Sequence, residues 1–482
     1  MAATTALPTG ANLDQLRKRA KDLHRAVLAG DPDALARIGD RPPAAFRLAC
    51  AQLVIAREYG FASWARLKRH VSVLTEFTRT IIGPPAPETA PLDALLQLGC
   101  LLYAADDGPE QWARARELLA AHPDLRGAGI HVAAMLADVE QVRRLLAGDR
   151  RLADRQGGPH RWEPLLYLAY SRIDPTVSAA AVRETARLLL DAGADANAGF
   201  FHNGLPSPFT VLTGAFGEGE RGPLRQPRHP HSLELARILL AAGADPNDSQ
   251  TLYNRMFEPG NDHLELLFSS GLGGGPGGPW RTRLVNATHP PADAIPSPAR
   301  LLRDQLRWAV NHGFVERVRL LLAHGVDPGP IEGERRSPAD QAARAGYPEV
   351  VSVLVEAGGP APTLRGPAAL VAAVLAGADD SALVGSPALA KERIPMAILD
   401  AVSAGRPAAV RRFAELGFDV NARGRHTALH EAAANNDVAM IELLLSLGAD
   451  PEILDTSFNA TPLGWAEYNY ATEATARLST LD

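Results

Sequence analysis

Residues 425–455, with the sequence RHTALHEAAANNDVAMIELLLSLGADPEILD, contain two short helix patterns joined by a turn. Thr427 is placed to cap the first helix, because its hydroxyl can accept a hydrogen bond from a free backbone N–H one turn further along. Asn436 lies in the turn, an apolar stripe begins at Val438, and Gly448 ends the second helix. Two helices this short, apolar on two sides, cannot bury their surface alone. The chain must therefore contain neighbouring copies of the same unit.

The order of residues in this segment resembles the ankyrin repeat. The opening T-x-L-H-x-A-A and the closing L-L-L-x-x-G-A-D carry the resemblance, with Ala428 in place of the usual proline and Asn436 in place of the usual glycine. The resemblance implies an all-α ankyrin-repeat solenoid, built from helix–turn–helix repeats with short hairpin loops. It also implies that His430 ties backbone groups of neighbouring repeats together. The residues that fit the pattern are Thr427, Leu429, His430, Ala432, Ala433, Leu443, Leu444, Gly448, Ala449 and Asp450.

Copies of the pattern occur through most of the chain. Gly325 and Gly358, which close two helices, are 33 residues apart, the period of an ankyrin repeat. Wider intervals, such as the 50 residues between Gly193 and Gly243, indicate insertions. We therefore expect an array of about nine units, several of them degenerate. We assign degenerate repeats to residues 93–157, clearer repeats to 158–272, an insertion to 273–298, repeats to 299–457 and a partial C-terminal cap to 458–482.

Residues 1–80 predict a small helical module in front of the array. Asn12 is placed as a cap, and apolar residues then recur at helical spacing from Leu13 to Val27. Residues 51–71 carry a resemblance to an N-terminal extension of many bacterial ankyrin-repeat proteins. The basic residues of this module could contact an acidic partner or nucleic acid, although cationic residues on an amphipathic helix usually form its solvated face. The proline-rich residues 81–92 predict a stiff linker.

The bulk composition indicates a folded protein without general affinity for nucleic acid. The net charge is −6 and the pI is near 6.2. Lysine occurs only at positions 18, 21, 68 and 391, whereas arginine and alanine are abundant, which indicates a GC-rich bacterial genome. We expect a monomer whose partner is an as yet unidentified protein.

The two cysteines, Cys50 and Cys100, cannot build a disulfide framework or a thiolate zinc site with C-x-x-C spacing. A reducing cytoplasm is therefore expected. The first residues lack the apolar core of a signal peptide, and the longest apolar run, which starts at Pro367, is shorter than the roughly 20 residues that span a bilayer. We expect neither secretion nor membrane insertion.

Two insertions interrupt the repeats, at residues 216–232 and 273–298. Loops that project from a rigid array often hold binding residues, because insertions there leave the stack intact. The first insertion could bind an anion or an acidic peptide, or it could be a solvated flexible loop. Its H-x-H pair could supply two metal ligands, but without cysteines or a placed carboxylate nearby we expect no metal site. The candidate residues in it are Arg221, Arg225, Arg228, His229 and His231.

Residues 250–267 form a second polar cluster, at the turn between two helices of one short repeat. Asp262 or Glu258 could act with His263 as a general acid or base in a pocket. Such turns are more often polar because they face water, with Asn261 and Asp262 as a helix cap. The cluster comprises Tyr253, Asn254, Arg255, Glu258, Asn261, Asp262 and His263.

Catalytic motifs are absent from the sequence. Gly273, Gly275 and Gly278 match G-x-G-x-x-G, but Pro276 and Pro279 interrupt the match and neither a strand nor a helix is placed around it. The chain has no phosphate-binding G-x-x-x-x-G-K loop, no G-x-S-x-G elbow and no H-E-x-x-H helix. We therefore predict a protein that is not an enzyme and needs no cofactor.

These features predict an interaction scaffold that binds a partner protein through the concave face and the inserted loops of the array. A second hypothesis is a ligand-binding or enzymatic protein with its site in the loops or in residues 250–267. A third is a structural array whose N-terminal module binds the partner. The scaffold hypothesis places partner contacts at hairpin tips and inner helical edges. The tips include Asn197, Asn247, Asp419, Arg423 and Arg425, and the inner edges include Tyr167, Tyr170, Asn435 and Asn436.

Overall fold

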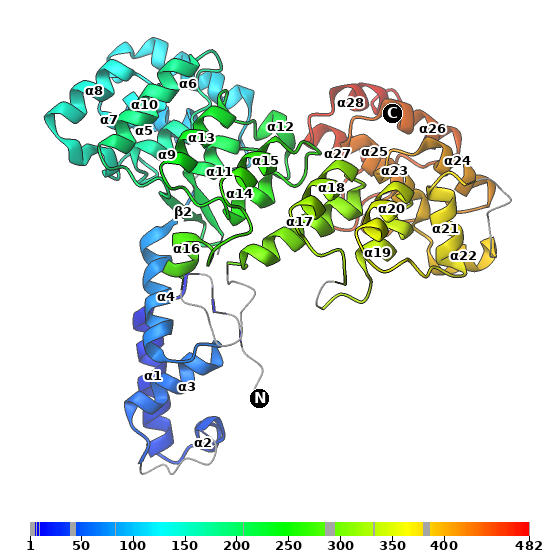
Figure 1. Cartoon of the computed structure of the whole chain (residues 1–482), viewed down its shortest axis with the longest axis horizontal. Coiled ribbons are helices and arrows are strands. Elements are labelled where there is room, and N and C mark those ends of the chain that lie inside the picture. The colour runs from blue at the N-terminus through cyan, green and yellow to red at the C-terminus, as the bar shows by residue number, and fades with distance from the viewer. Residues whose placement is uncertain are drawn as a thin grey trace. The chain divides into compact units, whose positions relative to one another are not determined.

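The chain divides into two compact units, residues 1–301 and residues 302–482. The computed structural model of the protein describes residues 5, 7–8, 10–38, 45–81, 83–205, 207–284, 295–330, 333–378 and 386–481. Helices make up nearly all of the regular structure, which confirms the all-α fold (Figure 1). Helix α17, Pro298–His312, contains the boundary between the units.

The first four helices have an apolar core of their own, drawn in blue in Figure 1. The side chain of Asn12 accepts a hydrogen bond from the backbone N–H of Asp14, as its position predicts. The apolar seam that begins at Leu16 is buried, and α1 packs along α3. These helices are α1, Leu13–Leu28; α2, Pro32–Ile38; α3, Leu48–Glu58; and α4, Trp64–Phe77.

A small sheet, which the sequence analysis did not predict, follows α4. Its strands are β1, Thr78–Arg79; β2, Gly199–His202; and β3, Pro208–Thr210. Strand β1 pairs parallel to β2, and β2 pairs antiparallel to β3. Beyond β1, the backbone N–H of Ile81 donates to Asn203 Oδ1 at 2.9 Å, so the chain is tied to the repeats before the proline-rich segment begins.

Two rows of helices form the rest of the first unit. In the first row α5, α7, α9, α11 and α14 contact one another in turn, and in the second row α8, α10, α13 and α15 do so. In each row, the helices bury their apolar side against the neighbouring repeat, as expected for stacked repeats. The bounds are α5, Pro91–Leu98; α6, Pro109–Ala121; η2, Pro123–Gly127; α7, Ile130–Met135; α8, Val139–Gly148; η3, Arg150–Asp154; α9, Pro164–Tyr170; α10, Ala179–Asp191; α11, Val211–Phe216; α12, Gly222–Arg225; α13, Ser232–Ala241; α14, Ser249–Asn254; and α15, Asp262–Ser269.

The insertion at residues 273–298 is folded where the structure describes it, and its residues 285–294 lie outside the described part. Helix α16, Gly278–Arg283, places Trp280 against the rings of Phe77 and Phe201. The Trp280 indole N–H also donates to the backbone oxygen of Asn197 at 2.9 Å. This insertion therefore joins the end of α4 to strand β2 through a small apolar cluster.

The second unit repeats the same helix-pair arrangement. Helices α23, α25 and α27 contact one another in turn, α26 packs on α28, and α18 packs on α20. The residues that we assigned to a partial cap contain a complete helix pair, α27 and α28. The bounds are α18, Val315–Ala323; α19, Pro338–Arg344; α20, Pro348–Glu356; α21, Pro367–Leu375; α22, Pro387–Arg393; α23, Ala397–Ser403; α24, Pro407–Glu415; α25, Ala428–Ala434; α26, Val438–Ser446; α27, Pro462–Tyr468; and α28, Thr472–Leu478.

The repeat at residues 425–455 has the local geometry that its sequence predicts. His430 Nδ1 accepts from the backbone N–H of Thr427 at 3.3 Å, which leaves Nε2 as the donor to the carbonyl oxygen of Ala460 at 3.1 Å. His430 thus links its own repeat to the next one. Asn436 has a φ of 54°, so it takes the left-handed conformation for which glycine is the usual residue.

The stacked arrangement predicts that damage to one repeat stays local. Leu444 is fully buried in the core of the second unit. We expect Leu444→Asp to cost at least about 3 kcal/mol, because it buries a charge without a partner. Hydrogen exchange should then accelerate in α25 to α28 first, since each repeat depends on its neighbours. Uniform acceleration from α1 onward would contradict the one-dimensional picture.

Candidate partner-binding site

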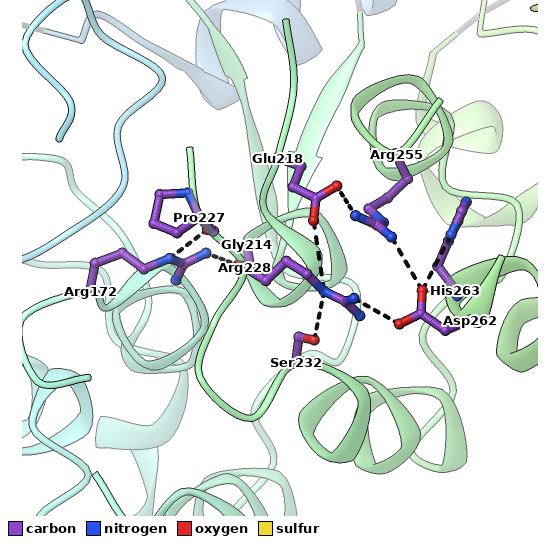
Figure 2. A network of polar contacts seen from close by, with 9 residues as sticks. All are labelled: Arg172, Gly214, Glu218, Pro227, Arg228, Ser232, Arg255, Asp262 and His263. Carbon is purple, nitrogen blue, oxygen red and sulfur yellow. Dashed lines mark hydrogen bonds and ion pairs between the residues drawn. The ribbon is translucent and has the colours of Figure 1, made fainter. Parts of the chain in front are cut away.

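The insertion at residues 216–232 is ordered and held against the repeats by Arg172. This side chain is fully buried and donates through Nε to the carbonyl oxygen of Pro227 at 2.9 Å and through Nη2 to that of Gly214 at 2.8 Å (Figure 2). Its Nη1 donates to the carbonyls of Ala169 and Ser171. A guanidinium group has five N–H donors, so one side chain can fix several backbone segments at once. The flexible-loop alternative is therefore wrong for this insertion.

A partly buried group of two arginines and two carboxylates lies beside this loop (Figure 2). Arg255, whose side chain is 2% exposed, forms an ion pair with Glu218 and donates to Asp262 Oδ1 at 3.2 Å. Arg228 donates to Asp262 Oδ2 at 2.7 Å and to Ser232 Oγ at 3.1 Å. The positive and negative charges balance, which is how proteins tolerate charge in their interior. We call these four charged residues the Arg255 network.

Asp262 of the Arg255 network does not have the properties of a general acid. The side chains of His263 and Arg228 hold the pKa of Asp262 well below its usual range, against the effect of burial. Asp262 therefore stays ionised near neutral pH, where a general acid would have to be protonated. His263, the other proposed member, is 0% exposed. The network fixes the loop and the turn between α14 and α15.

Removing one charge from the Arg255 network should be more damaging than removing a matched pair. We expect Arg255→Met to lower the free energy of unfolding by about 3–5 kcal/mol, because it removes the ion-pair partner closest to the buried carboxylate of Glu218. Adding Glu218→Gln should recover part of this loss. Urea unfolding, with hydrogen exchange of residues 217–231 as the local probe, checks both variants. If the double variant lost the sum of the two single losses, the two residues would not be coupled.

Two other carboxyl groups of the first unit are buried and hold backbone in place. Asp248 caps α14, accepting from the backbone N–H of Thr251 at 2.8 Å, and also accepts from the hydroxyl of Thr210 on the neighbouring repeat. Asp107 accepts from the backbone N–H of Leu102 at 3.2 Å and from that of Ala104 at 3.2 Å. Burial raises the pKa of Asp248 to about 6 and that of Asp107 to about 7, although these hydrogen bonds oppose the shift.

These raised pKa values predict how stability depends on pH. A carboxyl group whose pKa is higher in the folded than in the unfolded chain stabilises the fold below about pH 4, and this contribution is lost as the pH rises through the folded pKa. We therefore expect the urea midpoint of the first unit to fall between pH 4 and pH 7. In Asp248→Asn the free energy of unfolding should fall less steeply over this range, by at most about 1.4 kcal/mol per pH unit. Identical slopes in the two proteins would contradict the assignment.

The structure buries or engages most residues that the sequence analysis placed in the loops. His229 is buried, and Asn254 is buried and donates to the Tyr103 hydroxyl at 2.9 Å. His231 Nε2 lies 2.6 Å from the carbonyl oxygen of Val177. The half-buried Arg225 donates to Ala105 O at 2.6 Å, and the exposed Tyr253 contacts Glu220 through its hydroxyl. His229 and Asn254 therefore cannot meet a partner, and the H-x-H pair faces protein atoms.

The residues proposed at the hairpin tips and inner edges divide into two groups. Tyr167 and Tyr170 are fully buried, so they are core residues and not inner-edge contacts. Four candidates in residues 423–455 are exposed. Of these, Arg423 donates to Leu454 O at 2.9 Å, and Arg425 lies over the ring of Phe458. Asn435 and Asn436 complete the exposed group.

Asparagine at the hairpin tips ties repeats together. Asn197 Nδ2 donates to Gly243 O at 2.8 Å, and its Oδ1 accepts from the backbone N–H of Asp245 at 2.8 Å. Asn421 makes the same pair of bonds to Gly448 and Asp450. Asn247 likewise donates to Gly274 O and accepts from Gly273 N, and Asp419 Oδ1 accepts from the N–H of Asn421. These tip side chains are thus occupied by the array itself.

A cavity of about 720 Å³ lies in the second unit among the first helices of successive pairs. Sequence reasoning did not identify this site. Its walls come from α17, the segment before α19, α19 itself, the end of α21 and α23. Four arginines line it, together with two carboxylates and several uncharged polar groups. The lining residues that matter below are Arg307, Arg335, Arg336, Arg344, Glu334 and Ser403.

The charges in this cavity are not balanced by the described part of the protein. Arg307 pairs with Glu334 at 3.2 Å and with Asp304 at 3.2 Å, and Glu334 also accepts from Gln341. The Nε atom of the half-buried Arg344 has no hydrogen-bond partner among the described residues. Burial, and then the like charge of Arg336, lower the pKa of the Arg344 guanidinium. An added negative charge here would relieve that repulsion.

The floor of the cavity is rigid. Arg406 lies over the ring of Tyr347, with 4.5 Å between its guanidinium carbon and the ring centroid, and donates to the carbonyl oxygens of Ala345 and Leu375. Gly313 packs directly on the same ring, so closely that a Cβ atom there would collide with Tyr347. These contacts fix α19 and α20 against their neighbours, and the cavity is formed before anything binds.

Comparison with known proteins identifies the second unit in part. A family model described as ankyrin repeats, in many copies, matches residues 398–445. This segment is therefore similar to ankyrin repeats. It includes the helix pairs α23–α24 and α25–α26, and α23 supplies one wall of the cavity. Ankyrin repeats generally mediate protein–protein interaction. No curated protein matches the chain.

Among the described residues, no helix combines the length and apolar character needed to cross a membrane. No group of three or more histidine, cysteine or acidic side chains in the described ranges is arranged to hold a metal ion.

Proposed function

We propose that this protein is a non-catalytic interaction scaffold that binds a partner protein on the inner-helix face of its second unit. The cavity among α17, α19, α21 and α23 carries this proposal, because it is polar and lined by four arginines, of which Arg344 has a buried nitrogen without a hydrogen-bond partner among the described residues. The segment similar to ankyrin repeats forms one of its walls. Extended inner surfaces of stacked repeats are suited to binding other proteins.

The exposed candidates in residues 423–455 extend the proposed surface. Arg423, Arg425 and Asn435 lie on the repeat that follows the cavity wall, and their side chains reach solvent. The insertion at 216–232 is not part of the proposed surface, because Arg172 and the Arg255 network hold it against the repeats of the first unit. The same network argues against the catalytic alternative for residues 250–267, because its charges neutralise one another.

Filling the cavity should block the partner. Ser403 is exposed on α23 and lines the cavity, whereas Val355 is exposed on α20 outside it. A photo-crosslinking residue placed at position 403 should attach a discrete protein from an extract of the source organism, and one at 355 should not. Once that protein is purified, Ser403→Trp should weaken its affinity for the full chain at least about 10-fold, and Val355→Trp less than about 2-fold. Equal effects at the two positions would refute the proposed face.

A further inference from the structure

The cavity of the second unit holds more positive charge than the described residues around it neutralise. It is lined by four arginines and by the carboxylates of Glu334 and Asp400. Glu334 is already engaged by Arg307 and Gln341. Arg335 and Arg336 are exposed and form no ion pair with a described residue. This local excess contrasts with the net charge of −6 on the whole chain.

Arg344 shows this excess of positive charge most clearly. It projects from the last turn of α19 into the cavity, with part of its guanidinium group buried. Its buried Nε has no hydrogen-bond partner in the described part of the chain, and the charge of Arg336 opposes its own. A buried donor without an acceptor costs about 1–3 kcal/mol, and more when the group is charged. A carboxylate is the side-chain anion whose planar shape matches a guanidinium group.

We propose that this cavity binds an acidic segment of the partner protein, with an aspartate or glutamate carboxylate held by Arg336 and Arg344. This inference rests on the proposed function and specifies the chemistry of the same face. Around the arginines, Asn311 and Ser403 offer donors and acceptors for a peptide backbone, and Tyr347 offers an apolar surface. A free small anion would use the arginines alone and leave these groups without a role.

A nucleic acid fits this surface less well. Phosphate backbones are bound by an extended stripe of cations, at which affinity grows with the number of contacts. Here the four arginines gather around one cavity, and the carboxylates of Glu334 and Asp400 line the same walls. Those carboxylates would repel a neighbouring phosphate, whereas a peptide can place an uncharged or basic residue beside them.

The test uses the full chain and a defined probe, a capped and fluorescein-labelled peptide of six Asp-Ser repeats, with six Asn-Ser repeats as its matched control. Fluorescence anisotropy at low salt should detect binding of the acidic peptide only. Arg344→Ala and Arg336→Ala should each weaken it about 10-fold, the effect of losing one charge-assisted hydrogen bond. Arg344→Lys should recover part of the loss, because it restores the charge without the planar fork.

Arg319→Ala is the charge-matched control. Arg319 lies on α18, pairs with Glu349 at 3.0 Å and does not line the cavity, so its loss should change the affinity less than about 2-fold. Circular dichroism of every variant verifies the fold. The proposal is overturned if the Asn-Ser peptide binds equally, if Arg319→Ala acts like Arg344→Ala, or if inorganic phosphate or a 12-nucleotide single strand binds through the same arginines and the acidic peptide does not.

The two proposals fail in different ways. If Ser403→Trp blocks the purified partner but Arg336→Ala and Arg344→Ala leave its affinity unchanged, the scaffold function stands and the acidic-segment inference is wrong. If the Asp-Ser peptide binds through Arg344 but no protein is crosslinked from position 403, the cavity binds anionic peptides and the scaffold function is wrong. Changing the acidic residues of the crosslinked partner segment to Asn and Gln should reproduce the loss seen with Arg344→Ala.

Discussion

Every repeat of this protein depends on its neighbours because its helices are too short to bury their own apolar surface. Helix α25 has seven residues and α26 has nine, and both place their apolar side chains against the adjoining pairs. Apolar burial contributes roughly 25 cal/mol per Å², so most of the stabilisation lies between repeats. Specific polar links such as His430 to Ala460 then fix the spacing of adjacent units. An insertion is compatible with this architecture only if it leaves that stacking intact.

Local sequence was sufficient for the features that depend on neighbouring residues. The cap at Asn12, the left-handed Asn436 and the link made by His430 all follow from residue type and spacing. The sheet could not be found in this way. Its strands are two to four residues long, and β1 pairs with a segment more than 100 residues away. Nothing in the sequence near Thr78 indicates that partner.

The candidate site was also beyond local reasoning, for a related reason. Glu218, Arg255 and Asp262 were visible as polar residues, but burial and mutual pairing decide that they are structural. For the cavity arginines, the sequence gives no sign of a site, whereas the structure brings them together. Arg307 and Arg344 lie on different helices, and each resembles an ordinary solvated residue in its own segment. Only the register of the stacked helices brings them to one cavity.

Buried arginines occur in both units and are held to different degrees by protein atoms. In the first unit, four carbonyl oxygens accept from Arg172, and Arg255 pairs with Glu218 and Asp262, although Arg255 Nε has no hydrogen-bond partner among the described residues. In the second unit, Arg344 has a buried nitrogen without a described acceptor, on a rigid floor set by Tyr347 and Arg406. Charge that the fold does not use is available to a ligand. A preformed cavity loses little conformational entropy on binding, so one correctly placed carboxylate can select this face.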